Sequence, residues 1–392
     1  MRSYKSLYKA ALEAAPLRLH FAAHSHHPWP NATREAQLQF WDDSARFLDE
    51  KWEKRIFGEV LPEAKRFLIR HLRLPVQTQI AVAQSSHELA YRLLSCFPLS
   101  QKFRVLTTDS EFYSFSRQLA RLEEEGLCSV ERIPVEPFNT FPARFTDRAR
   151  SGQFNLAFVS HTFFNSGYVF RELETLAAET PEQTWIAIDG YHAFGAIPVD
   201  LSQIGQRIFY LAGGYKYAQA GEGACFMTLP ARANELKPRD TGWFAGFGSL
   251  TGAPGKSVEF PSDWQRFAGS TFDPSAWYRF NAVMRLWEYE GIDVELIHAR
   301  AQILQRRFLD RLAEHAPARL STEMRVVTGR DLDRQGNFLT FALADAARIQ
   351  QALMRQEVIT DSRGTRLRFG FGLYHDLADV ERLLEKLAVS AD

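Results

Sequence analysis

The chain has 392 residues, 45% of them apolar and 24% charged, which is enough to bury a large core and too many for one small domain. Lysine plus arginine and aspartate plus glutamate number 47 each, so no overall positive field exists for nucleic acid or an anionic membrane. No apolar run approaches the ~18 residues of a membrane span, and the N-terminus lacks the apolar core of a signal peptide. We expect a cytoplasmic protein of two domains that binds neither nucleic acid nor membrane.

The cysteines are few and isolated. Cys96, Cys128 and Cys225 are odd in number and form no CxxC pair. This spacing predicts neither a disulfide framework nor a zinc site, and we expect the three thiols to be buried.

Residues 1–60 are expected to form an N-terminal arm and a leading helix. The sequence from Asn31 to Leu74 is largely helical, with Thr33 as a candidate N-cap and Phe40 and Trp41 among apolar residues at helical spacing.

Residues 61–272 are expected to form the large domain. Between Pro75 and Leu229, short β-rich runs alternate with helical stretches, which is typical of an α/β fold with a parallel sheet covered by helices. The expected strands are 80–83, 105–107, 155–160, 185–189, 209–212 and 224–229. Ligands bind at the carboxyl ends of such strands. Residues 241–272 are rich in Gly, Ser and Pro and predict a long irregular connection.

Residues 273–392 are expected to form a small α+β C-terminal domain. Two helices are predicted from Pro274 to about Glu314, followed by short β-rich segments, a helix from Ala346 and a final helix from Asp379.

Two charged residues end apolar runs and are the leading candidates for chemistry. Asp189 ends WIAID, and a carboxylate buried at a sheet edge is costly unless a cation meets it. Lys216, between Tyr215 and Tyr217, follows the next run and Gly213-Gly214, where burial could make it an amine nucleophile. Taken alone, Asp189 would more often be a helix or turn cap and Lys216 a surface side chain. Together they indicate a cofactor bound through an imine with lysine.

The window DGYHAFGAIPVDL, followed by AGGYKY and GEGACF, resembles the class V group of fold-type I pyridoxal phosphate enzymes and looks most like kynureninases. The resemblance implies a large domain with a mainly parallel seven-stranded sheet, a small C-terminal domain and pyridoxal 5'-phosphate as cofactor. It also implies that Lys216 forms the imine and Asp189 pairs with the pyridine nitrogen. His192 would lie near O3' of the cofactor, and Tyr215 would bind its phosphate.

Further motifs match the cofactor site of that family. QSSHELAYRLL places Ser85, Ser86 and His87 at a helix start suited to a phosphate, although simple capping by Ser86 remains an alternative. In DSEFYSFSR, Phe112 aligns with the aromatic residue that stacks on the cofactor ring, with a core role as the alternative. In SHTFFNSG, Asn165 matches a residue near the cofactor. Ser160, His161 and Thr162 of the same motif end a strand at this edge and are further candidates.

Two loop motifs supply further candidates, and the second implies a homodimer with a shared active site. TGWFAGF resembles a kynureninase segment whose tryptophan lines the substrate pocket, which makes Trp243 a substrate-binding candidate. AGSTFDP resembles a stretch of that family that reaches across the dimer interface to the phosphate of the partner's cofactor. This makes Ser270 and Thr271 cofactor-binding candidates. The alternative for this loop is an ordinary turn, with Asp273 capping the next helix.

The substrate side is expected to recognise an amino acid. In TDSRGTRLRFGF, Arg368, with Arg363 second, matches the arginine that clamps the substrate's α-carboxylate, although a solvated strand arginine is the alternative. HSHHPWP departs from the kynureninase pattern except at Ser25. His24 or Ser25 is expected to face substrate rather than metal.

The resemblance implies a kynureninase-like hydrolase that cleaves the Cβ–Cγ bond of its substrate. A class V aminotransferase and a catalytically silent dimeric scaffold remain alternatives. The cysteine desulfurase branch is not expected, because residues 315–392 contain no cysteine.

Overall fold

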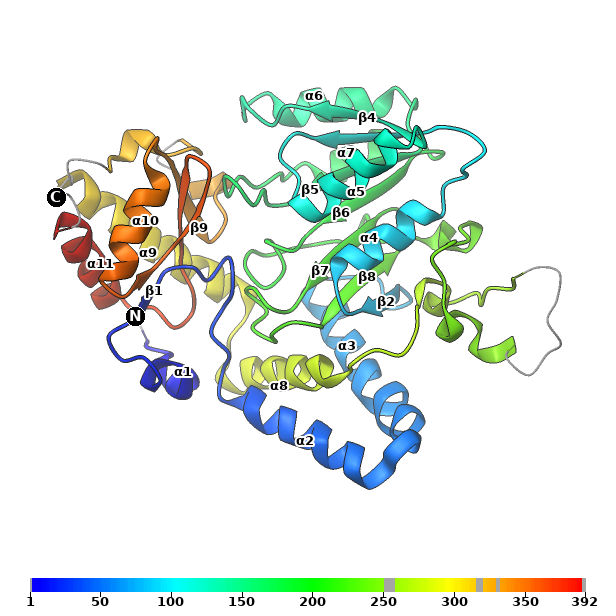
Figure 1. Cartoon of the computed structure of the whole chain (residues 1–392), viewed down its shortest axis with the longest axis horizontal. Helices are drawn as coiled ribbons and strands as arrows, with labels where there is room; N and C mark the ends of the chain where they lie inside the picture. Colours follow the sequence, from blue (N-terminus) through cyan, green and yellow to red (C-terminus); the bar gives the residue numbers. More distant parts are fainter. Residues whose placement is uncertain (1, 250–257, 315–319, 329–331, 390–392) are drawn as a thin grey trace.

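A seven-stranded sheet forms the centre of the computed structural model, which describes residues 2–249, 258–314, 320–328 and 332–389. The strand order is β2-β8-β7-β6-β5-β3-β4 (Figure 1). Every neighbouring pair is parallel except those of β8, which runs antiparallel to β2 and β7. The expected mainly parallel sheet is confirmed. The strands are β2 (Gln79–Ala83), β3 (Phe103–Thr108), β4 (Cys128–Ile133), β5 (Leu156–Ser160), β6 (Trp185–Asp189), β7 (Phe209–Gly213) and β8 (Cys225–Leu229).

The edge strand β4 is not among the strands expected from the sequence. It pairs only with β3, and its side chains after Cys128 are half-buried or exposed. The adjacent charged residues Glu131 and Arg132 interrupt the apolar residues of this edge strand, so its sequence contains no continuous apolar run.

Helices cover both faces of the sheet. On one face, α4 (Ser86–Ser95) and α5 (Tyr113–Glu124) pack on a core that includes Val105. On the other face, α6 (Phe141–Arg150), α7 (Leu173–Glu179) and α8 (Ser275–Glu290) share a core with Leu106. The successive strand residues Val105 and Leu106 thus face opposite cores, as strand geometry requires. Because α8 packs with the large sheet, the proposed domain boundary near residue 273 is not a boundary of this core.

The N-terminal segment is helical over most of the expected range but is interrupted. The helix α2 (Ala32–Phe47) starts just before Thr33, whose hydroxyl donates to the carbonyl of Pro30 at 2.7 Å instead of capping the helix. The backbone of Leu48 has φ +52°, which ends α2. Further elements of this segment are η1 (Lys5–Tyr8), α1 (Lys9–Glu13), β1 (Leu19–His20), η2 (Leu48–Glu50), the π-helix η3 (Trp52–Val60) and α3 (Leu61–His71).

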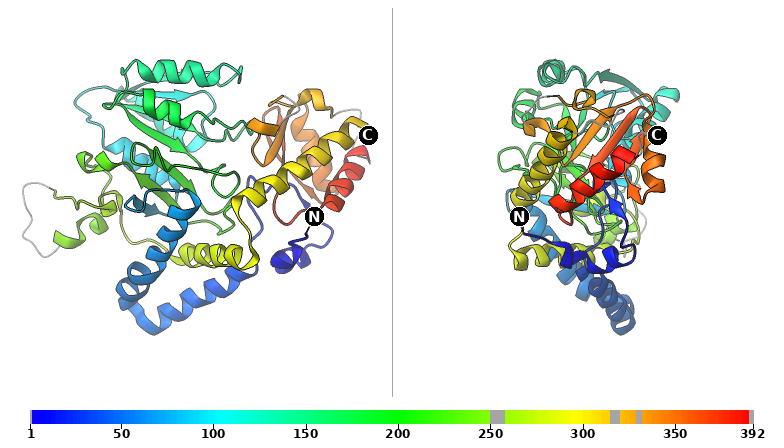
Figure 2. Two further views of the ribbon diagram at one scale, coloured as in Figure 1. Left: turned by 180° about the vertical axis from the view of Figure 1, so that it is seen from behind. Right: turned by 90° about the vertical axis from the view of Figure 1, so that its left-hand side faces the viewer.

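The C-terminal elements form an antiparallel sheet in the order β11-β12-β9, with its own core. Both chain ends lie beside this unit (Figure 2). Strand β1 pairs in parallel with β10, so the N-terminal segment packs against this C-terminal unit. Its elements are α9 (Val294–Glu314), η7 (Thr322–Met324), η8 (Leu332–Arg334), β9 (Phe338–Ala342), α10 (Ala346–Arg355), β10 (Val358–Ile359), β11 (Asp361–Arg363), β12 (Arg366–Gly370) and α11 (Leu377–Val389).

The connection expected over residues 241–272 contains only short helical turns where it is described. These are η5 (Trp243–Ser249) and η6 (Trp264–Phe267), preceded by η4 (Ala231–Glu235). Residues 250–257 of this predicted loop lie outside the described residues. Within the described ranges, no helix combines the length and apolar character needed to cross a bilayer.

Candidate active site

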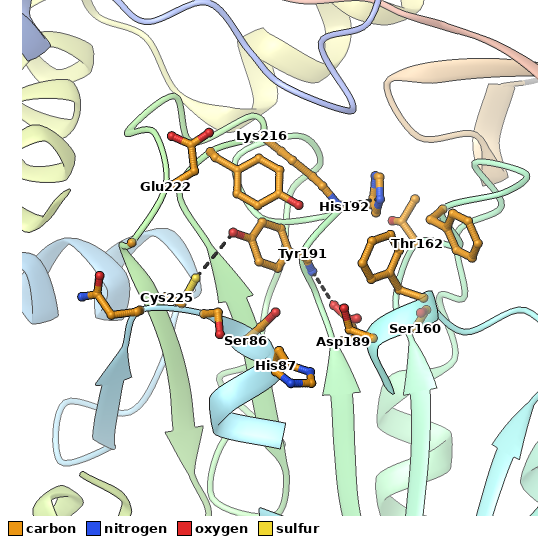
Figure 3. A pocket seen from close by; sticks show the side chains of 17 residues that line it. Ser86, His87, Ser160, Thr162, Asp189, Tyr191, His192, Lys216, Glu222 and Cys225 are labelled. Carbon is orange, nitrogen blue, oxygen red and sulfur yellow. Dashed lines mark hydrogen bonds between the residues drawn. The ribbon is translucent and has the colours of Figure 1, made fainter. Parts of the chain in front are cut away.

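A cavity of ≈ 320 Å³ opens at the carboxyl ends of the parallel strands (Figure 3). Ten of the predicted site residues line it: Ser85, Ser86, His87, Phe112, Ser160, Thr162, Asp189, His192, Tyr215 and Lys216. The sequence thus identified most of the wall from short motifs that lie far apart in the chain.

Asp189 is the last residue of β6 and faces the cavity. Its Oδ1 accepts a hydrogen bond of 2.9 Å from the backbone N–H of Tyr191. Burial raises the pKa of Asp189, while this hydrogen bond and the charge of Lys216 act in the opposite direction. Gly190 is required at the strand end, because a Cβ there would lie 2.1 Å from Cζ of Tyr210. The carboxylate is therefore held at a fixed position on the cavity floor.

Lys216 follows β7 and reaches the same cavity. Burial lowers the pKa of Lys216 to about 7, although Asp189 raises it in part. The amine also lies 4.6 Å from the ring centroid of Tyr191. A buried amine with this pKa is partly neutral near neutral pH and can act as a nucleophile or a base.

His192 is the closest polar neighbour of that amine. Nζ of Lys216 lies 2.6 Å from Nε2 of His192. Burial and the charge of Lys216 lower the pKa of His192 well below its usual value, so the ring is neutral. Its Nε2 then accepts from the ammonium form of Lys216, and its Nδ1 carries the proton. Among the described residues, Nδ1 has no hydrogen-bond partner.

The start of α4 forms the other side of the cavity. Oγ of Ser85 accepts the backbone N–H of Glu88 at 3.2 Å, so Ser85, not Ser86, caps this helix. The alternative role considered for Ser86 is therefore wrong. The first N–H groups of a helix lack intrahelical acceptors and attract anions, which makes this end a candidate phosphate site.

Aromatic rings form the upper wall. The centroid of Phe112 is 5.6 Å from Nζ of Lys216, and its ring meets that of Phe164 edge-on at 5.4 Å. Phe112 is half-buried and lines the cavity rather than the core.

A buried carboxyl group that the sequence analysis did not identify lies next to this wall. Oε1 of Glu111 accepts from the hydroxyl of Thr108 at 2.7 Å and from the N–H of Ser160 at 3.2 Å, and Oε2 accepts from the hydroxyl of Ser160 at 2.5 Å. Burial raises the pKa of Glu111 to about 8, against these hydrogen bonds, and the charge of Asp189 adds to the rise. In the sequence, the feature that could have identified Glu111 as a site residue is its position directly before Phe112.

Other residues lining the cavity were not predicted as site residues by the sequence motifs. They are Gln84, Ser114, Phe164, Tyr191, Glu222, Gly223 and Cys225. Tyr191, within DGYHAF, links Asp189 to Cys225, whose Sγ lies 3.5 Å from the tyrosine hydroxyl. Burial raises the pKa of the Cys225 thiol to about 11, so it remains protonated.

Two of the predicted substrate residues lie directly behind the wall. Arg368 is buried on β12, where it donates to the carbonyl oxygen of Phe164 and pairs with Asp361. His24 is fully buried and stacks on Phe338 with centroids 4.6 Å apart. Neither residue lines the cavity itself.

The remaining predicted residues lie farther from the cavity or on the surface. Arg363 is exposed, whereas Ser25 and Asn165 are half-buried outside the cavity wall. Trp243 is 44% exposed, and its indole N–H donates to Oγ1 of Thr271 at 3.3 Å. Ser270, like Thr271, is exposed.

The histidine-rich loop contains no metal cluster in the described part of the chain. Nδ1 of His27 donates to the carbonyl oxygen of Pro28 at 2.8 Å, and the ring of His26 stacks on Tyr215 with centroids 4.9 Å apart. These histidines therefore make separate contacts instead of converging on one point.

Comparison with known proteins supports the resemblance read from the sequence. Residues 297–387 match the family model described as the kynureninase C-terminal domain. Kynureninase from Pseudomonas fluorescens is 25% identical over 217 residues, which cover 54% of this chain and 50% of that protein. Isopenicillin N epimerase from Streptomyces clavuligerus is 25% identical over 176 residues, 44% of this chain and 42% of the other. The chain thus spans about half the length of the curated relatives it matches.

Solved structures share the fold over almost the whole chain. The cystine C–S lyase C-DES, in complex with its product cysteine persulfide, has a TM-score of 0.78 at 17% identity and covers 95% of this chain and 97% of its own. A C-DES mutant with glycine covalently linked to its PLP cofactor has a TM-score of 0.80 at 16% identity, with 99% of both chains covered. An apo cysteine desulfurase from Thermococcus onnurineus has a TM-score of 0.79 at 14% identity, covering 99% and 98%. The chain therefore has the fold-type I architecture of class V pyridoxal phosphate-dependent enzymes, with a C-terminal region similar to that of kynureninases.

Proposed function

We propose that the cavity binds pyridoxal 5'-phosphate and that Lys216 and Asp189 are its principal partners. The observation that carries this proposal is that a buried amine and a half-buried carboxylate face one cavity at the carboxyl edge of the sheet. When bound, the cofactor supplies an aldehyde that an amine can join and a ring that accepts electrons from the substrate's Cα.

The cavity offers a suitable group for each part of the cofactor. The N-terminus of α4, with Ser85, Ser86 and His87, would hold the phosphate, together with the hydroxyl of Tyr215. The acceptor-only carboxylate of Asp189 suits a protonated pyridine nitrogen.

Residues above and beside the ring complete this arrangement. Phe112 would cover the ring face and exclude water. His192 would hold Nζ of Lys216 in place, and Asn165 remains a candidate neighbour.

The residues also define what happens to the substrate. Lys216, with its pKa of about 7, is suited to take the proton from Cα and to return a proton to the substrate. We propose that Arg368, with Arg363 as the second candidate, binds the α-carboxylate, and that His24 or Ser25 lies toward the substrate. The substrate is therefore an amino acid.

Among the reactions of this fold, we propose kynureninase-like hydrolysis of the Cβ–Cγ bond. The match of residues 297–387 to the kynureninase C-terminal domain supports it, because this segment contains Arg363 and Arg368. The 25% sequence identity to the kynureninase of Pseudomonas fluorescens supports this reaction further.

Transfer of the amino group to a keto acid is the second candidate reaction. It requires the same lysine, carboxylate and arginine, so these residues do not discriminate between the two. A silent scaffold would have no need for a buried, partly neutral lysine.

We propose further that the protein is a homodimer whose two active sites are shared. The indole of Trp243 and the hydroxyls of Ser270 and Thr271 are exposed in one subunit and lie outside its own cavity. We propose that all three complete the cavity of the partner, a role that the sequence motifs imply for Ser270 and Thr271. A partner subunit would then cover the exposed rings of Trp243 and Phe247, which lie near the hydrogen bond between Trp243 and Thr271.

The cofactor is tested by incubating the purified protein with pyridoxal phosphate and recording the near-visible absorbance. We expect a yellow protein whose colour is bleached by borohydride. After this reduction, mass spectrometry should find the cofactor attached covalently to the Lys216 peptide. Lys216→Ala should fold, give no such band and lack activity. A colourless wild type would contradict cofactor binding.

The reaction is tested with a panel of amino acids that includes kynurenine and 3-hydroxykynurenine. Alanine release, amino transfer to keto acids and sulfide release are measured separately. We expect alanine from kynurenine or a related substrate. Amino transfer without alanine would favour the aminotransferase.

A further inference from the structure

Three side chains form a row across the C-terminal sheet, on the side that faces the active site. Asp361 on β11 is in register with Arg368 on β12, which is in register with Thr340 on β9. Register partners project from the same face of a sheet. Arg368 also donates to the carbonyl of Phe164, a residue of the cavity wall, so the row lies directly behind that wall.

The guanidinium of Arg368 is only partly satisfied by the protein. One Nη donates to Phe164 and the other to Asp361, but Nε is buried and has no acceptor among the described residues. A buried N–H without an acceptor is costly unless a ligand supplies one. The carboxylate of Asp361 thus already occupies part of the Arg368 guanidinium, which is proposed to bind the substrate's α-carboxylate.

Asp361 has a second polar neighbour that has no other partner. Its Oδ2 lies 3.8 Å from Nε2 of His24, and its Oδ1 lies 3.7 Å from Nη1 of Arg363. His24 is fully buried, and within the described ranges neither of its ring nitrogens has a hydrogen-bond partner. A small rotation of the Asp361 carboxylate toward His24 would satisfy that ring and release the guanidinium.

We propose that Asp361 determines substrate specificity as an internal competitor: its carboxylate pairs with Arg368 in the free protein and yields that position to the substrate's carboxylate, turning toward His24. This inference rests on the proposed role of Arg368. The pair of Arg368 and Asp361 has no net charge, so it attracts a carboxylate less strongly than a lone arginine would. A second acid group on the substrate, placed near this pair, would also be repelled by Asp361. The preferred substrates are therefore amino acids with a single carboxylate.

The experiment measures binding of propionate, a carboxylate without an amine, to the cofactor-loaded protein by calorimetry. Asp361→Asn should bind propionate about tenfold more tightly than the wild type, since the competing charge is gone. Asp361→Glu keeps the charge and should bind like the wild type. Asp361→Ser is a second neutral variant, and its comparison with Asp361→Glu decides the question if Asp361→Asn does not fold.

The matched control is another buried arginine of the same unit that pairs with an aspartate. Arg300 donates from Nη2 to Oδ1 of Asp376 at 3.0 Å, away from the cavity. Asp376→Asn should lower thermal stability without changing propionate affinity. His24→Phe removes the site to which Asp361 turns and should weaken propionate binding.

The outcomes separate this inference from the proposed function. Equal or weaker propionate binding by the neutral variants at position 361 would mean that Asp361 only orients Arg368, which overturns the competitor role. If Arg368→Gln binds propionate as tightly as the wild type, the proposed carboxylate clamp itself is wrong.

Discussion

The ε-amine of Lys216 lies 2.6 Å from Nε2 of His192, although the two residues are 24 positions apart in the chain. His192 follows the end of β6, and Lys216 follows the end of the adjacent strand β7. The parallel pairing of these strands brings the two side chains to one edge of the sheet. A neutral imidazole beside the amine fixes where Nζ sits without adding a positive charge.

The reactivity of Lys216 should titrate far below that of surface lysines. Because burial lowers the pKa of Lys216 to about 7, half of the amine is neutral near that pH. Reductive methylation of the cofactor-free protein with formaldehyde, followed by mass spectrometry of the Lys216 peptide, should reach its half-maximal rate near pH 7. Asp189→Asn removes a charge that raises this pKa, so the midpoint should move to lower pH. A midpoint near the usual value of 10.5 would contradict this prediction.

Asp189→Asn should fold and lose most activity. The amide still accepts the backbone N–H of Tyr191 through its oxygen, so the strand end is preserved. It carries no charge to hold a proton on the cofactor ring, and we expect kcat to fall by about a hundredfold or more. Thermal melting and steady-state kinetics check the two halves of this prediction. A variant with wild-type kcat would place the ring partner elsewhere.

Glu111→Gln should change how stability depends on pH. The pKa of Glu111 is raised by burial from its usual 4.5 to about 8, so between these values the folded protein holds a proton that the unfolded chain has lost. The stability of the wild type therefore falls as pH rises through this window, by at most about 1.4 kcal/mol per pH unit. Glutamine cannot titrate, and the free energy of unfolding of the variant should rise relative to the wild type from pH 4.5 to 8.

Urea unfolding at several pH values measures that difference. Glu131→Gln is the control, because its hydrogen bond with Arg148 lowers the pKa of Glu131, and its difference from the wild type should stay flat over the same window. A flat profile for Glu111→Gln as well would show that Glu111 is ionised in the folded protein.

Arg368→Lys should weaken substrate binding more than catalysis. Lysine keeps one positive charge but loses the planar fork that matches a carboxylate. We expect KM for the amino acid to rise about tenfold, which corresponds to ~1.4 kcal/mol, with a smaller change in kcat. Steady-state kinetics measures both, and an unchanged KM would assign the carboxylate to another residue.

Mixing two inactive variants should restore activity if the sites are shared. Lys216→Ala removes the amine of one cavity, and Trp243→Ala removes a side chain proposed to act in the partner's cavity. After subunit exchange at equal amounts, each mixed dimer would have one intact site, which gives about a quarter of wild-type activity. Trp41→Ala, at an exposed tryptophan on α2, should be active alone. No recovery on mixing would mean that Trp243 acts within its own subunit.

Residue patterns alone predict the part of the site where a charged residue follows an apolar run, whereas other predicted wall residues, such as Phe112 and His192, come from motifs that resemble a known family. Asp189 and Lys216 are of the first kind, because strands of a parallel sheet read as short apolar segments and their ends meet at one edge. Such apolar runs do not indicate whether a strand is parallel or antiparallel to its neighbours. The antiparallel β8 was therefore expected only as a strand.

Glu111 and Asp361 could not be identified in this way. A lone acidic residue in sequence reads as a solvated side chain, and only the tertiary structure buries these two. The same holds for the half-exposed strand β4 and for β1, which has two residues and a partner more than 300 positions away.

The pairing of β1 with β10 has a consequence for biosynthesis. Leu19 and Phe21 belong to the same hydrophobic cluster as residues from Ala301 to Leu387. Leu19 and Phe21 therefore lack these packing partners during synthesis until the segment from Ala301 to Leu387 has been translated, while the intervening sheet can already assemble. Deleting β1 or deleting α11 would remove part of the same hydrophobic core.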